Sequence, residues 1–126
     1  MRTATTVDAV TLPRHLRLGE LDYAFNAAPL EDLANPATEG PRPADASGRS
    51  DQVFRLEAEV RRGGLLRRAA CAGRDLYAVT APLVGEALAR ILAGRVARGG
   101  CLAAGEAFEA ADFLRALSPR ELSLEL

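Results

Sequence analysis

Residues 51–73, DQVFRLEAEVRRGGLLRRAACAG, decide the fold. Apolar side chains occupy every second position of the first half: Phe54, Leu56, Ala58 and Val60. The positions between them are charged, and this period of two is typical of a half-buried β-strand. Gly63 and Gly64 follow, and they predict a turn because glycine adopts positive φ at little cost. Residues 65–72 then predict the returning strand, so the sequence indicates an antiparallel hairpin.

The chain before the hairpin predicts two strands and a long loop. Residues 5–12 are rich in β-branched side chains and end at Pro13, which favours a strand. Residues 18–26 predict a second strand, with Leu21, Tyr23 and Phe25 on one face. Residues 27–50 contain repeated turn and breaker signals and predict a long loop able to act as a lid, with one short helical turn at 30–34.

The chain after the hairpin predicts two helices and a final strand. Residues 76–93 have apolar side chains at helical spacing, with Glu86 and Arg90 expected on the wetter side. Asp75 or Thr80 is expected to cap this helix, with Pro82 in its first turn. A shorter helix is predicted over 109–117 and a last strand over 121–126. Together these elements predict a single α+β domain over residues 1–126, a mostly antiparallel sheet with two or three helices packed on one face.

Composition excludes several function classes. The 126 residues carry a formal net charge of −1 and no lysine, which argues against a nucleic-acid binder and against Schiff-base chemistry. With one histidine and two distant cysteines, Cys71 and Cys101, no metal site or cofactor is predicted, and the cysteines are expected to be small buried hydrophobes. The first residues lack the apolar run of a signal peptide, and no stretch is long enough to span a membrane. We therefore expect a cytoplasmic protein that contacts neither membranes nor nucleic acids.

Four segments occur in an order that resembles a known family. They are TLPRH at 11–15, YAFNAAPL at 23–30, GRDLYAVTAPLV at 73–84, and AGEAF at 104–108 followed by DFL at 112–114. They resemble the C-terminal substrate and oligomerisation domain of saccharopine dehydrogenase-like NAD(P)-dependent oxidoreductases. The sequence has no Gly-x-Gly-x-x-Gly phosphate turn of a Rossmann domain, so the resemblance does not imply hydride transfer. It implies a sheet that packs against another body, and a small-molecule pocket.

We expect this pocket to use a small set of polar and aromatic side chains. The expected catalytic groups are His15, Tyr23, Asn26 and Tyr77, and the expected substrate-binding groups are Asp22, Phe25 and Thr80. His15 is the only side chain with an unperturbed pKa near neutrality. Structural alternatives remain open: a surface histidine in a turn, core tyrosines, a solvated strand edge for Asp22 and Asn26, and a helix cap for Thr80.

Three functions are consistent with this reading. The first is a cofactor-independent isomerase or cyclase of a biosynthetic pathway, acting on a small hydrophobic metabolite such as a polyketide. The second is the substrate-domain subunit of a split NAD(P)-dependent oxidoreductase that docks onto a separate Rossmann subunit. The third is a non-catalytic binding or assembly module. In all three we expect a homo-oligomer, because the surface that faces the second domain in the family should be apolar.

Overall fold

The computed structural model describes residues 6–126, apart from the side chain of Leu33, and it confirms the predicted hairpin. Strands β1 (Val53–Arg62) and β2 (Leu65–Arg74) pair antiparallel, with Phe54 opposite Gly73 and Arg62 opposite Leu65. Gly63 and Gly64 form the turn with φ of 55° and 81°. The predicted last strand is β3 (Ser123–Glu125), which pairs with β2 and completes a sheet of order β1-β2-β3.

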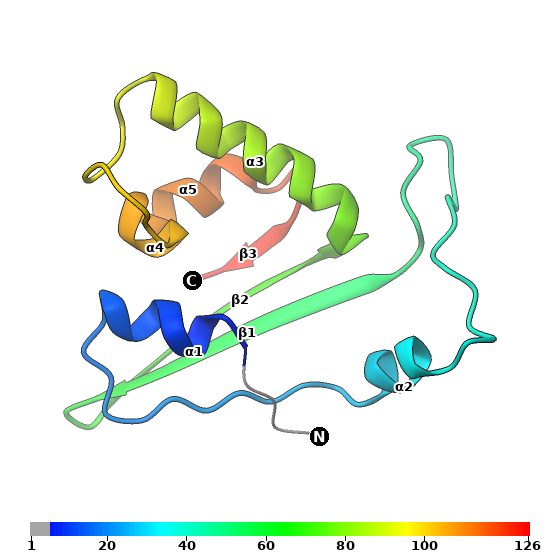
Figure 1. Ribbon diagram of the computed structural model, residues 1–126, viewed down its shortest axis with the longest axis horizontal. Helices are drawn as coiled ribbons and strands as arrows, with labels where there is room; N and C mark the ends of the chain where they lie inside the picture. Colours follow the sequence, from blue (N-terminus) through cyan, green and yellow to red (C-terminus); the bar gives the residue numbers. More distant parts are fainter. Residues whose placement is uncertain (1–5) are drawn as a thin grey trace.

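The helices that follow the hairpin lie on one side of this sheet (Figure 1). They are α3 (Leu76–Leu92), α4 (Ala104–Ala107) and α5 (Ala110–Leu117), so the α+β fold and both predicted helices are confirmed. Asp75 caps α3 as predicted, because its carboxylate accepts a 3.0 Å hydrogen bond from the Ala78 N–H. Pro82 lies in the second turn of α3 and not in the first.

The N-terminal segment is helical where a strand was predicted. Residues 6–12 contribute to helix α1 (Asp8–Thr11) and the 3₁₀ helix η1 (Leu12–Arg14), while residue 5 lies outside the described residues. The prediction was wrong because no neighbouring strand pairs with this segment. Its backbone groups bond locally instead, as in the 3.1 Å contact from the Thr11 N–H to the Val7 carbonyl.

The second predicted strand, 18–26, is not part of the three-stranded sheet, and only Phe25 within it forms an isolated bridge. Its side chains alternate as predicted, with Leu21, Tyr23 and Phe25 half-buried and Asp22 and Asn26 exposed. The strand prediction was therefore wrong about the hydrogen bonding of this segment and right about which side chains face the protein and which face solvent.

The predicted loop over 27–50 is irregular apart from α2 (Ala28–Ala34), which is longer than the helical turn that the sequence indicated. Its last part is tied to the rest of the fold. Asp45 pairs with Arg74, Arg49 pairs with Glu121, and the Ser50 N–H donates to the Asp75 carboxylate at 2.8 Å. These contacts fix the entry to β1 beside the start of α3.

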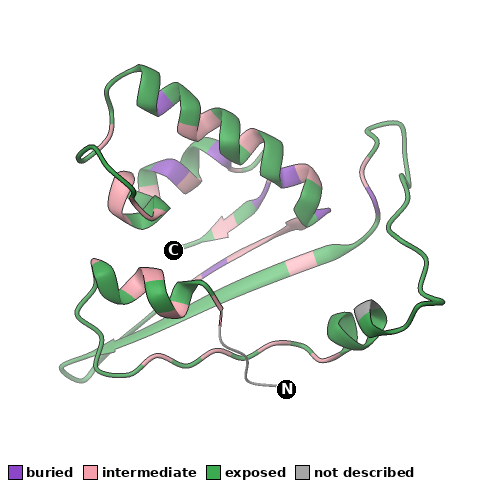
Figure 2. Ribbon diagram, in the orientation of Figure 1, coloured by how far each residue is buried: buried purple, intermediate pink, exposed green. Residues whose placement is uncertain are grey.

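The core lies between the helices and the part of the hairpin next to them. Its buried members are Val79, Phe113, Leu117 and Leu122. Figure 2 shows the buried residues gathered in α3, α5, β2 and the segment before β3, while the half of the hairpin nearest its turn is exposed. The chain exposes 9806 Å², whereas a folded monomer of 13.4 kDa exposes roughly 6,500 Å². This chain therefore covers much less of its surface than a self-contained domain of its size.

Candidate functional site

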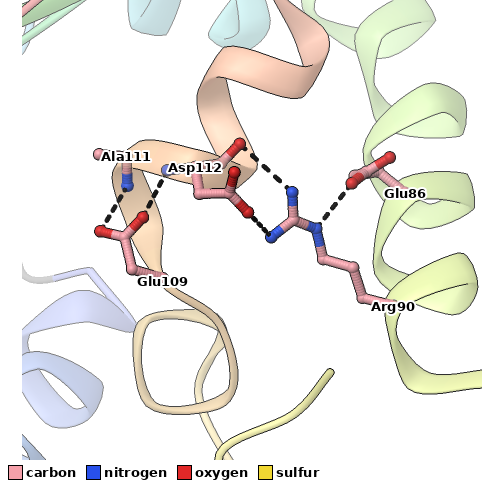
Figure 3. A network of polar contacts seen from close by, with 5 residues as sticks. All are labelled: Glu86, Arg90, Glu109, Ala111 and Asp112. Carbon is pink, nitrogen blue, oxygen red and sulfur yellow. Dashed lines mark hydrogen bonds and ion pairs between the residues drawn. The ribbon is translucent and has the colours of Figure 1, made fainter. Parts of the chain in front are cut away.

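Helix α3 directs its two charged side chains into the molecule. Arg90 is 4% exposed, and its guanidinium lies 2.6 Å from the Glu86 carboxylate and 2.6 Å from that of Asp112 on α5 (Figure 3). It also donates to the Asp112 carbonyl at 3.2 Å and lies 5.0 Å from the centre of the Phe113 ring. The prediction that Glu86 and Arg90 occupy the wetter side of the helix is wrong, because Arg90 is buried against α5, where Asp112 supplies a carboxylate partner.

This charge network sets how α3 is rotated about its axis. The Glu86 carboxylate raises the pKa of the Arg90 guanidinium, and Asp112 adds to this against the opposing effect of burial. Arg90 therefore stays charged, and a rotation of α3 that turned Arg90 outward would break its two hydrogen bonds to Asp112. Glu109 holds the other side of the contact by accepting hydrogen bonds from the N–H groups of Ala111 and Asp112 at the start of α5 (Figure 3).

The opposite side of α3 is apolar and faces solvent. We call it the outer seam, five residues spaced alternately by four and three positions: Tyr77, Ala81, Val84, Leu88 and Ile91. All five are exposed, Tyr77 by 74% and Val84 by 62%. Such spacing is the pattern by which one helix packs along another. Since Glu86 and Arg90 are the only charged residues of α3, the outer seam carries no charge.

A second apolar surface lies on the hairpin beyond the helices. Leu56, Val60 and Leu65 share the sheet face that carries Phe54 into the core, yet each is more than half exposed. An open hollow at the turn is lined by Val60, Leu65 and three neighbouring residues, Arg62, Gly63 and Arg67. The core face of the sheet thus continues, uncovered, toward the turn.

The structure does not bring the four expected catalytic side chains together in one described hollow. The His15 ring packs against α4, where a Cβ added to Gly105 would lie 2.8 Å from its Nε2, and its Nδ1 lies 3.1 Å from the Thr11 carbonyl. The Tyr23 hydroxyl is buried and has no hydrogen-bond partner among the described residues. Tyr77 belongs to the outer seam.

Of the expected substrate-binding residues, Phe25 lines an open hollow, and it does so beside Asn26. This open hollow lies between α2 and the start of β1, and its other lining residues are Pro29, Leu30, Val53, Phe54, Arg55 and Ala72. Asn26 accepts a long hydrogen bond, 3.4 Å, from the Ala28 N–H at the start of α2. Asp22 is exposed, and the Thr80 hydroxyl donates to the Leu76 carbonyl within α3 at 3.3 Å.

The two cysteines are free and differ in their surroundings. Cys71 is half-buried beside the core, and burial raises the pKa of its thiol. Cys101 is exposed, so the expectation of two buried cysteines is wrong for that residue. Across residues 6–126 we find no group of three side chains placed to hold a metal ion, and no helix long and apolar enough to cross a bilayer.

Sequence reasoning missed the outer seam although its signal was present. The helical spacing of Val84, Leu88, Ile91 and Leu92 predicts one apolar face, and the two charges are expected on the opposite, wetter side, whereas the structure exposes these apolar residues. Comparison with known proteins gives no further guide to the site: no family model matches the chain, and no curated protein or solved structure matches it.

Proposed function

We propose that this chain is an assembly module, a subunit that completes its apolar packing by association. The observation that carries the proposal is the exposed area of 9806 Å², roughly 3,300 Å² more than a monomer of this mass exposes. Obligate interfaces bury roughly 2,000–5,000 Å² in total over both partners. The excess is therefore large enough to supply one side of such an interface.

The kind of surface that is exposed supports the same proposal. Monomeric proteins rarely expose continuous apolar patches beyond a few hundred square ångströms. Here the outer seam runs along a 17-residue helix, and the exposed hairpin surface adds Leu56, Val60 and Leu65. No charged group lies on the outer seam to oppose burial, since the charges of α3 are paired on its inner side, whereas Arg62 and Arg67 accompany the apolar residues of the hairpin surface.

The test is sedimentation of the purified chain from low to high micromolar concentration, combined with binding of the dye ANS to exposed apolar surface. We expect a complex of several chains that binds little dye. A single chain that binds dye strongly and aggregates would also support an assembly role, with a different protein as the missing partner. A single chain that binds no dye and unfolds cooperatively would contradict the proposal.

A second candidate is binding of a small hydrophobic molecule in the hollow beside Phe25 and Asn26. The observation that favours it is that these two expected site residues line one hollow with the apolar Pro29 and Leu30 and with Arg55. The isomerase or cyclase suggested by the family resemblance would act there. Given a substrate found by screening, we expect Asn26→Ala to lower kcat/KM. The exposed Asp51→Asn serves as the control and should leave kcat/KM unchanged. Equal kcat/KM values for the parent chain and both variants would remove this candidate.

The split oxidoreductase is tested separately by titrating the chain with NADPH in a calorimeter. On the assembly proposal the chain alone gives no binding heat. Micromolar binding would instead support an oxidoreductase role and turn attention to a nucleotide site within this chain.

A further inference from the structure

We infer that two copies of this chain associate through α3, with their outer seams antiparallel about a two-fold axis at Val84. The inference rests on the proposed assembly role and names its partner, a second copy of the same chain. It follows from the spacing, the sizes and the charges of the seam residues, and from the area that the chain leaves uncovered.

The spacing of the seam suits a helix of the same kind. Its residues recur at four, three, four and three positions, which keeps them in line along a helix about 25 Å long. Tyr77, Leu88 and Ile91 provide large apolar side chains, each at least 53% exposed. A row of this kind packs into the grooves of another helix, whereas its exposure to water brings no stabilisation.

The sizes of the side chains select the antiparallel arrangement. With the axis at Val84, each Val84 meets its counterpart, Ala81 meets Leu88, and Tyr77 meets Ile91. The small Ala81 then lies opposite the large Leu88 in both copies, which fills the space between the helices at those positions. In a parallel pair Ala81 would face Ala81 and leave a gap there. The Ala81–Leu88 pairing therefore favours the arrangement in which one copy is reversed.

The absence of charge on the outer seam favours an apolar partner over a charged one. No acidic or basic side chain lies on the seam, so a charged partner would bury its charges without counterions. A second copy brings an equally uncharged face, because its own Glu86 and Arg90 are held against its own α5. Closed two-fold dimers are also the commonest form of homo-oligomer.

The uncovered area is sufficient for such a dimer. An obligate homodimer removes roughly 1,000–2,500 Å² from each chain, and the chain as a whole exposes roughly 3,300 Å² above the monomer value, to which both α3 and the exposed loop over 27–50 contribute. The outer seam and its flank, including the 79% exposed Leu92, are open to solvent along the length of α3. Association along α3 therefore needs no rearrangement of the described fold.

Cysteine cross-linking of the full chain tests this arrangement. In a background of Cys71→Ala and Cys101→Ser, Val84→Cys places one thiol at the proposed axis. Ala89→Cys is the matched control: it is exposed on the same helix but lies about 140° further round it. With a short thiol-specific bifunctional reagent, we expect at least roughly tenfold more two-chain product from Val84→Cys than from the control.

Direction is tested by mixing Tyr77→Cys with Ile91→Cys. We expect the mixed product to exceed the product of either variant alone, and a predominance of the two self-products would overturn the antiparallel arrangement.

Leu88→Glu, with Ala89→Glu as control, adds a thermodynamic test. We expect Leu88→Glu to weaken the dimer roughly a hundredfold or more by sedimentation, because it buries two carboxylates without partners, while circular dichroism stays unchanged.

The outcomes separate this inference from the proposed function. If the parent chain forms a complex but Val84→Cys and Ala89→Cys react equally, the pairing through α3 is refuted and the assembly role stands. If the parent sediments as a single chain that binds ANS, a different protein covers the seam and the second copy is refuted. If it is a single chain that binds no ANS, both proposals fail.

Discussion

The two sides of helix α3 invert the usual arrangement of a helix at a protein surface. The inner side carries the buried Val79 together with Glu86 and Arg90, and the outer side carries Val84, Leu88 and no charge. An ordinary surface helix presents charged residues to water and an apolar stripe to the core. Here an ion network holds the helix to α5, while the apolar stripe faces solvent.

This inversion shows that burial of a side chain within one chain and burial within an assembly place different requirements on that side chain. The inner side needs specific partners, because Arg90 is buried and each of its hydrogen bonds must be supplied. The outer side needs only an apolar surface of matching shape. Substitutions on the two sides should therefore differ in whether their effect depends on chain concentration.

The largest effect is expected from Phe113→Ala on the inner side. Phe113 is 7% exposed and packs in a small core, so its truncation should lower the free energy of unfolding by about 3–5 kcal/mol. The loss should be the same at all chain concentrations.

Ile91→Ala on the outer seam should lower the urea midpoint only where chains associate. Concentration-independent losses for both variants would abolish the distinction between the two sides.

A smaller effect is expected from Arg90→Met, which removes the charge that Glu86 and Asp112 share. The remaining carboxylates lose their common partner, and Tm should fall by roughly 5 °C. Arg61→Met is the matched control, since that side chain is 78% exposed beside Glu59 and should change Tm by less than about 1 °C. Equal changes in the two melting curves would mean that the inner network does not hold α3.

Gly85→Ala should raise stability slightly. A Cβ at this exposed glycine would meet nothing within 4 Å, and alanine favours a helix over glycine by about 1 kcal/mol. The gain should appear in the urea midpoint of the dilute chain. If the gain in stability becomes smaller as chains associate, a partner helix lies close to Gly85. A loss of stability in the dilute chain would contradict the structure, in which nothing covers Gly85.

The most gradual effect is expected from pH at the start of α3. The Ser50 N–H, followed by that of Ala78, lowers the pKa of the Asp75 carboxyl in the folded chain. A depressed pKa contributes stability above the unfolded value of about 4, and this stability is lost as pH falls through the lower folded value. The urea midpoint should fall with acid below about pH 4, and less steeply in Asp75→Asn. An unchanged slope in Asp75→Asn would assign the acid sensitivity to other carboxylates.

Local patterns in the sequence predicted the elements whose hydrogen bonds are local or join neighbouring segments. The hairpin, α3 and α5 follow from periodicity and turn residues. The strand predicted at 5–12 failed because strand formation depends on a neighbouring strand, which no local pattern reveals. The side of α3 that faces the core was also hidden, because the partner of Arg90 is Asp112, 22 residues further along the chain.

The candidate site was less predictable than the fold. The chemistry of single residues suggested His15, Tyr23 and Tyr77 as one pocket, but side-chain type does not fix where the chain carries each residue. His15 packs on Gly105, and Tyr77 faces outward on α3. Phe25 and Asn26, which are adjacent in sequence, do share a hollow. The apolar pattern of α3 was visible but ambiguous, because core and interface residues are alike.

Asp75 also has a consequence for the order in which the chain folds. Its N–H donates to the Gln52 carbonyl at 2.7 Å, and its carboxylate accepts from Ser50, so it joins the two ends of the hairpin. When β1 and β2 pair outward from their turn, these two ends meet without the closure of any additional loop. We therefore expect the hairpin to form first and the first turn of α3 to become stable only afterwards, so that the strands act as the template on which the helix begins.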